Sequence, residues 1–179
     1  KDLNFMPGSN YLYSNSNYIL LAEIIENVTK KSFVNFTNEI FAELNMDETS
    51  FEDNSSAIQG RMSKTYFNID CSSNYKWKWN VVGDGNFFST LTDQIIWEKT
   101  IQGYGNPAIS REVINKSQQL DGINNNFKYG YGLEFGEYKG LSYRFHEGAT
   151  GAWKATVIRF EKENLSIITM TNSGKTIPS

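Results

Sequence analysis

Three short polar segments, far apart in the chain, contain residue types that can take part in proton or acyl transfer. The first is Tyr13-Ser14-Asn15, which precedes an apolar periodic run, and the second is the glycine-rich stretch at residues 83–93, GDGNFFSTLTD. The third is His146-Glu147-Gly148. A phenol and an imidazole can relay a proton, and a side-chain amide can hold a substrate by hydrogen bonds. We expect Tyr13, Asn15 and His146 to converge on one cleft.

The sequence lacks the residues that a metal site, a disulfide or a conventional serine triad would need beside His146 and Cys71. His146 is the one histidine and no carboxylate cluster has the spacing of metal ligands, so we predict no metal site and no cofactor. Cys71 is the one cysteine, which excludes an intrachain disulfide, and we interpret it as a small residue beside a polar loop. A serine triad lacks the Gly-x-Ser-x-Gly turn that would expose its nucleophile. A lone histidine is also common as a structural residue, so that alternative stays open for His146.

Two helices surround the first polar segment in sequence. Apolar residues recur at helical spacing after Tyr13-Ser14-Asn15 and predict a helix over 16–29. Ser32 is a good N-cap, and the apolar residues that follow it predict a second helix over 33–44. The polar, aromatic stretch 47–80 has no period, which indicates a long loop or lid.

The last third of the chain changes from helical to strand periodicity. A helix capped by Thr90 or Thr92 and a short helix around 110–117 come first. Apolar and polar residues then alternate, with turns at 137–140 and 161–164 between the runs. This pattern predicts an antiparallel meander of three or four strands.

Helices followed by strands predict an α+β fold of mixed α/β layers, with helices packed on an antiparallel sheet. A length of 179 residues suits a single domain, with a helical part at about 1–126 and the meander at about 127–173. In this arrangement we expect His146 at the end of one strand.

Composition limits the classes of partner. Hydrophobic residues make up 39% and aromatic residues 15% of the chain, which excludes a disordered protein. No stretch approaches the roughly 20 apolar residues of a membrane span. A net charge of −3 gives no sign of a nucleic-acid surface. The four tryptophans and ten tyrosines instead favour a small-molecule, carbohydrate or peptide-sized partner.

In their order and spacing, the polar segments resemble those of the penicillin-recognising serine hydrolases. The most similar branch is the class C β-lactamase-like group, with D-alanyl-D-alanine carboxypeptidases, D-aminopeptidases and esterases. Tyr13-Ser14-Asn15 matches its Tyr-x-Asn motif, and His146-Glu147-Gly148 matches the His-x-Gly variant of its Lys-Thr-Gly motif. The stretch 43–51, ELNMDETSF, looks like its Leu-Gly-Met…Thr-x-Phe segment, with Asn45 in place of the usual glycine. The resemblance covers nearly the whole chain and implies a β-lactamase/transpeptidase-like fold.

The resemblance also implies a role for each candidate residue. Tyr13 would move a proton between a nucleophilic serine and the leaving group, and Asn15 would hydrogen-bond the substrate amide and the lysine beside that serine. His146 would contribute polarity near the tyrosine or near a substrate carboxylate. Gly148 would let the substrate lie against its strand, and the Ala149 N–H would be one oxyanion-hole donor. The substrate would be a β-lactam, a D-amino acid peptide or an ester. By the same resemblance, the protein would act outside the cytoplasm.

The nucleophile of that family is the serine of a Ser-x-x-Lys motif that precedes Tyr-x-Asn. The one match in this sequence, Ser73 with Lys76, lies downstream in a polar stretch with no apolar helix after it, so we do not expect it to be the nucleophile. We therefore expect the chain to be an incomplete, C-terminal portion of a longer protein and inactive alone. It should expose an apolar surface and an unpaired sheet edge, covered by a second copy of the chain or by the missing N-terminal segment.

Two other interpretations remain open at the level of sequence. The first is a non-catalytic, penicillin-binding-like module that binds peptidoglycan or peptide. The second is an α+β domain whose aromatic residues only form its core. A Ser-x-x-Lys motif upstream of Lys1 would favour the enzyme, and its absence would favour the binding module.

Overall fold

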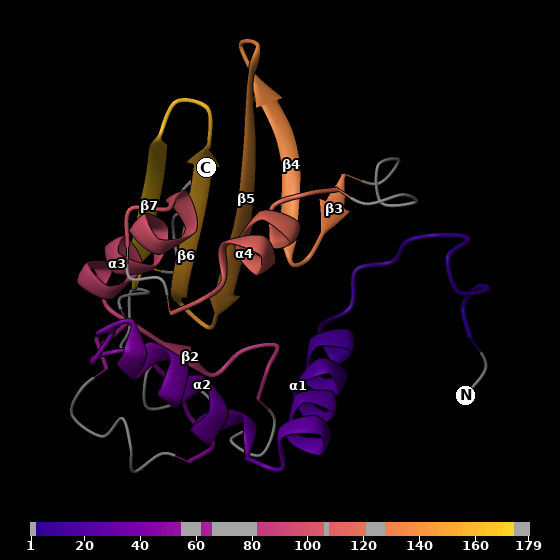
Figure 1. The fold of residues 1–179 in the computed structure, drawn as a ribbon, viewed down its shortest axis with the longest axis vertical. Helices are drawn as coiled ribbons and strands as arrows, with labels where there is room; N and C mark the ends of the chain where they lie inside the picture. Colours follow the sequence, from indigo (N-terminus) through magenta and orange to yellow (C-terminus); the bar gives the residue numbers. More distant parts are fainter. Residues whose placement is uncertain (1–2, 55–61, 66–81, 106–107, 121–127, 174–179) are drawn as a thin grey trace.

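In the computed structural model, residues 3–54, 62–65, 82–105, 108–120 and 128–173 are described. Cys71, Ser73 and Lys76, together with most of the predicted lid, lie outside these ranges. Figure 1 shows a sheet with α3 and α4 on it, and α1 and α2 beyond one end of the strands.

The helices begin at the capping residues that the sequence predicts. Their bounds are α1 Asn15–Thr29, α2 Phe33–Glu43, α3 Leu91–Gln102 and α4 Arg111–Ser117. The Ser32 and Thr90 side chains accept hydrogen bonds from backbone N–H groups in the first turns of α2 and α3, and Ser110 does the same for α4. Ser14 occupies the N-cap position of α1, but its side chain makes no capping hydrogen bond. The cap of α1 is therefore not what fixes the Tyr13-Ser14-Asn15 segment.

The strands form an antiparallel meander in the order β3-β4-β5-β6-β7. Their bounds are β3 Tyr129–Gly130, β4 Leu133–Tyr138, β5 Leu141–Thr150, β6 Trp153–Phe160 and β7 Leu165–Thr171. A separate pair joins β1 Ser50–Phe51, inside the predicted lid, to β2 Phe87–Phe88. The α+β class and the antiparallel meander are confirmed, whereas the prediction of three or four strands is wrong. The alternating run that begins at Tyr129 forms two strands, because Tyr131 and Gly132, with φ of 51° and 81°, turn the chain between β3 and β4.

The predicted position of His146 is also wrong. His146 lies within β5, which continues to Thr150 and pairs with β6 along that whole segment. The sequence stretch with Gly148 and Gly151 had indicated a strand end. Glycine weakens a strand but does not stop it, and only Gly151 has the positive φ, 59°, that makes the turn into β6.

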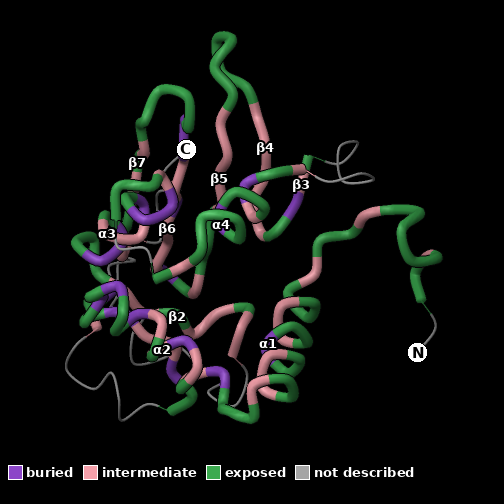
Figure 2. Tube along the Cα trace, in the orientation of Figure 1, coloured by how far each residue is buried: buried purple, intermediate pink, exposed green. Residues whose placement is uncertain are grey.

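Packing in the described residues has two centres. Phe41, Leu44 and Met46 are buried where α2 meets β1 and α3, and Figure 2 shows buried segments along α2 and α3. On the sheet, the Arg159 guanidinium binds the Glu98 carboxylate of α3, and both side chains are buried. This ion pair fixes α3 on the face of β6 and β7.

The apolar run of α1 lies at the surface. Leu20, Ile24 and Val28 are 60%, 55% and 77% exposed, and within α1 only Ala22 is buried. Monomeric proteins seldom leave an apolar helix face uncovered. We therefore expect self-association or capture of further polypeptide. Light scattering at micromolar concentration should report a mass above the 20.4 kDa of one chain. A monomer with a cooperative melt would contradict this expectation.

Candidate functional site

Tyr18, in the first turns of α1, is the point at which three parts of the chain meet. Its hydroxyl lies 3.2 Å from the Tyr129 hydroxyl of β3. A Cβ added at Gly132, in the β3–β4 turn, would lie 3.1 Å from the same hydroxyl. A Cβ at Gly83 would lie 2.8 Å from the Tyr18 carbonyl oxygen. The turn and the glycine loop thus pack directly on α1, because neither glycine has a side chain.

Aromatic rings from these elements form one group beside β5. The Tyr129 ring centre lies 5.4 Å from that of Tyr11, 5.8 Å from that of Tyr13 and 6.5 Å from that of His146. The Tyr13 and His146 ring centres are 6.3 Å apart. We call Tyr11, Tyr13, Tyr18, Tyr129 and His146 the tyrosine–histidine cluster.

The structure thus brings together Tyr13 and His146, two residues that the sequence singled out for chemistry. It adds Tyr11, Tyr18 and Tyr129, which the sequence did not single out for chemistry. The two tyrosines before α1, Tyr11 and Tyr13, were a sequence signal for an aromatic cluster at this place. Nothing in the sequence indicated that Tyr129 of β3 would pack against them.

Asn15, Gly148 and Ala149 lie at exposed positions near this cluster in sequence. Asn15 is the first residue of α1, two residues after Tyr13. Gly148 and Ala149 follow His146 on β5, and a Cβ added at Gly148 would meet no atom within 4 Å. The pairing of β4 with β5 ends at Phe145, so in the described sheet residues 146–150 pair with β6 alone. This part of β5 offers an open edge and open space to an extended ligand.

Burial and negative neighbours raise the pKa of three phenols of the cluster, Tyr11, Tyr13 and Tyr129. Burial raises the pKa of the Tyr13 hydroxyl above its usual 10.0, and Tyr18, Glu134 and Asp84 raise it further. Burial also raises the pKa of Tyr129, and so does its hydrogen bond with Tyr18. At neutral pH Tyr13 is therefore a proton donor, and it needs a nearby cation before it can act as a base.

The raised pKa values predict a loss of stability in alkali. The folded chain keeps the protons of Tyr11, Tyr13 and Tyr129 above pH 10, where the unfolded chain loses them. Their contribution to stability is complete below pH 10 and falls as the pH rises further. Tyrosine absorbance in an alkaline titration should show steps at higher pH in the folded than in the unfolded chain, with Tyr13→Phe removing one of these late steps. Simultaneous ionisation of all tyrosines in the folded chain would contradict the assignment.

The glycine loop gives a second prediction, with a matched control. Gly83 has φ +109°, and an added Cβ would also lie 2.9 Å from the Ala22 Cβ. Gly83→Ala should therefore lower the free energy of unfolding by about 1–3 kcal/mol in urea titrations. Gly85, two residues on, has open space around it, and Gly85→Ala should change this free energy by less than about 0.5 kcal/mol. Equal effects of the two substitutions would show that the loop does not pack on α1.

The described residues contain no group of three or more His, Cys, Asp or Glu side chains placed to hold a metal ion. No helix in this part of the chain is long and apolar enough to cross a membrane.

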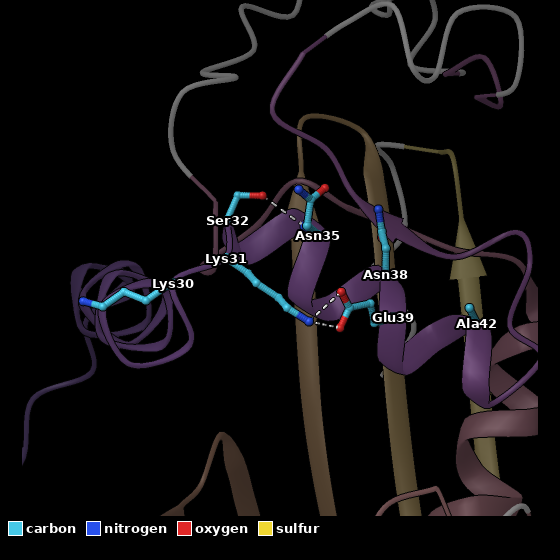
Figure 3. Close-up of a pocket in the computed structure, with 7 residues that line it drawn as sticks. All are labelled: Lys30, Lys31, Ser32, Asn35, Asn38, Glu39 and Ala42. Atoms are coloured by element: carbon cyan, nitrogen blue, oxygen red, sulfur yellow. Dashed lines mark hydrogen bonds and ion pairs between the residues drawn. The ribbon is translucent and has the colours of Figure 1, made fainter.

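A pocket of about 600 Å³ lies away from the cluster, at the corner between α1 and α2 (Figure 3). Its lining residues are Lys30, Lys31, Ser32, Asn35, Asn38, Glu39 and Ala42. The Lys31 Nζ is 2.8 Å from a Glu39 carboxylate oxygen, and Ser32 caps α2 through the Asn35 N–H. These polar groups stabilise the helix corner, and none of the residues predicted to do chemistry lines the pocket.

A family model and a curated relative identify the family to which the chain is similar. The family model described as Beta-lactamase matches residues 1–179. A D-aminopeptidase of Brucella anthropi is 28% identical over 181 residues, covering 96% of this chain and 33% of that protein. The chain thus spans about a third of the length of this relative.

Solved structures share the fold. The octameric penicillin-binding protein homologue from Pyrococcus abyssi superposes with a TM-score of 0.77 at 20% identity, over 96% of this chain and 41% of that one. A D-stereospecific amidohydrolase from Streptomyces sp. gives a TM-score of 0.72 at 21% identity, over 97% and 54%.

Proposed function

Because the chain belongs to the beta-lactamase family, we propose that it supplies part of the active site of a serine hydrolase. The reaction passes through an acyl-enzyme, and the substrate is a β-lactam, a D-amino acid peptide or an ester. The observation that carries the proposal is the 6.3 Å separation of the Tyr13 and His146 rings, which brings the two motif-bearing segments to one place.

In the proposed reaction the substrate lies along the open edge of β5. Gly148 leaves space for it, and the Ala149 N–H donates a hydrogen bond to the carbonyl oxygen as negative charge develops there. Asn15 holds the substrate amide. Tyr13 passes the proton of the attacking serine to the leaving nitrogen or oxygen.

The serine itself is proposed to come from polypeptide outside the 179 residues. Ser73 is the one serine with a lysine three positions later, and it follows the Tyr13 segment rather than preceding it. A lysine beside the nucleophile would also supply the cation that Tyr13 lacks among the described residues, and so would lower the pKa of its hydroxyl.

Among the substrate classes, D-amino acid amides and peptides are the first to test. The support is the likeness to a D-aminopeptidase and to a D-stereospecific amidohydrolase. The protein encoded by the complete open reading frame should release nitroaniline from D-phenylalanine p-nitroanilide and leave the L isomer intact. Absence of turnover with this substrate, with D-alanyl peptides, with esters and with β-lactams would overturn the proposal.

A non-catalytic binding module is the second candidate. The observation in its favour is the raised pKa of Tyr13, which suits a hydrogen-bond donor better than a base. The complete protein would then bind a D-amino acid peptide without cleaving it. Calorimetric binding with no product after prolonged incubation would select this candidate.

A further inference from the structure

We propose that Glu134 and the rings of the tyrosine–histidine cluster bind the protonated amine of the substrate. Glu134 is then the residue that selects substrates with an ammonium group near the bond that is cleaved. This inference rests on the proposed function, because it takes the cluster to be a substrate site, and it names the chemical class that the site accepts.

The register of the sheet places Glu134 beside the cluster. Glu134 lies directly opposite Tyr129 in the β3–β4 pair and opposite Phe145 in the β4–β5 pair. Side chains of directly opposed residues leave the same face of a sheet, with Cβ atoms roughly 5 Å apart. The Glu134 side chain therefore leaves the same face as that of Tyr129, whereas the side chain of His146, next to Phe145 on β5, leaves the other face.

A second carboxylate approaches from the glycine loop. Asp84 follows Gly83, whose backbone packs against Tyr18 and Ala22 of α1. Both Glu134 and Asp84 raise the pKa of the Tyr13 hydroxyl, as negative charges close to it must. The ion pairs between described residues lie elsewhere, at the α1–α2 corner, near the β6–β7 turn and between α3 and β6. Within this part of the chain, the negative charge beside the cluster is thus not neutralised by an ion pair.

The aromatic rings, like the two carboxylates, favour a positively charged ligand. A ring face attracts a cation by its quadrupole, and several tyrosines around one position form a site for an ammonium group. Tyr13 is 47% exposed, so a ligand reaches its ring from solvent, while Tyr129 meets it edge-on at 89°. Rings and carboxylates together attract an amine and repel a carboxylate.

This charge pattern separates two kinds of substrate. A peptide or amide with a free N-terminal amine has a positive charge near the first scissile bond. A substrate that ends in a carboxylate next to that bond has a negative charge there. The site is suited to the first kind, which makes the enzyme an aminopeptidase or amidase rather than a carboxypeptidase.

The one histidine of the chain provides a direct test. The 179-residue chain is titrated at pH 6.5 with D-phenylalaninamide, whose amine is then protonated, and with uncharged N-acetyl-D-phenylalaninamide. The NMR signals of the His146 imidazole report binding. We expect saturable shifts with D-phenylalaninamide, and binding at least about tenfold weaker with the acetylated compound.

Matched variants locate the effect. Glu134→Gln keeps the size of the side chain and should weaken D-phenylalaninamide binding about tenfold. Glu137→Gln, on the exposed end of the same strand, should leave it unchanged. Equal binding of both compounds, tighter binding of N-acetyl-D-phenylalanine, or no effect of Glu134→Gln in a folded variant would overturn the inference.

The outcome is separable from that of the proposed function. Amine-selective binding with no hydrolysis by the complete protein would uphold the ammonium site and reject the hydrolase. Hydrolysis with equal rates for amine and acetylated amide substrates would uphold the hydrolase and reject the ammonium site.

Discussion

Replacing Glu98 by glutamine is expected to lower the free energy of unfolding by about 3–5 kcal/mol. Arg159 donates through Nε to one carboxylate oxygen of Glu98, at 2.8 Å, and through Nη2 to the other, at 2.5 Å. The two residues are 5% and 4% exposed. Glutamine leaves the buried guanidinium without a counter-charge, and a buried unpaired charge is among the largest single costs in a folded protein.

The surrounding hydrogen bonds increase this effect. Ser166 of β7 donates to the same carboxylate at 2.6 Å, and Arg159 also donates to Gln118, the last residue of the α4 region. Both helices on the sheet and two of its strands therefore share one buried network. Loss of Glu98 should loosen all of them together.

Urea titration followed by circular dichroism measures the effect, with Glu161→Gln as the control. Glu161 pairs with Arg144 at 2.5 Å, but its side chain is 50% exposed, so this substitution should cost less than about 1 kcal/mol. Glu98→Met combined with Arg159→Met should recover much of the loss, since it removes both charges. Similar small costs for Glu98→Gln and Glu161→Gln would show that the network does not hold α3 on the sheet.

The second large effect is expected from Tyr13→Phe in the complete protein. The substitution removes the hydroxyl that moves the proton and keeps the ring that packs against Tyr129 at 5.8 Å. Loss of general acid–base catalysis should lower kcat by about 10²–10⁴-fold, with KM nearly unchanged. Stopped-flow or steady-state assays with D-phenylalanine p-nitroanilide measure both constants.

Tyr138→Phe is the matched control for Tyr13→Phe. Tyr138 is 57% exposed at the far end of β4, and its hydroxyl should have no part in catalysis. A Tyr13→Phe enzyme with kcat within about threefold of the parent would rule out Tyr13 as the proton carrier, since general acid–base catalysis contributes far more than this.

Local features of the fold could be predicted from the sequence because they depend on neighbouring residues. The caps Ser32, Thr90 and Ser110 set helix starts through bonds to residues three positions later. The replacement of a usual glycine by Asn45 is also explained locally. Asn45 has φ +59°, a conformation that glycine adopts freely and that asparagine tolerates better than most residues.

The site could be predicted only in part, because its assembly depends on contacts between distant segments. Motif spacing singled out Tyr13 and His146. Tyr129 reaches α1 because the β3–β4 turn at Gly132 packs on Tyr18, and Glu134 lies opposite Tyr129 in that hairpin. No local pattern indicates where a hairpin will pack. The approach of Asp84 likewise depends on Gly83 fitting against Tyr18.

The most direct test of the central claim is mass spectrometry of the complete protein after rapid mixing with D-phenylalanine p-nitrophenyl ester and an acid quench, because this activated ester has a protonated amine and no carboxylate. If the chain contributes to an acyl-transfer site, the protein should release p-nitrophenol and gain the mass of one D-phenylalanyl group. Peptide mapping should then place the adduct on a serine outside the 179 residues, three positions before a lysine. No adduct on any serine would contradict acyl transfer, and an adduct on Ser73 would contradict the proposed source of the nucleophile.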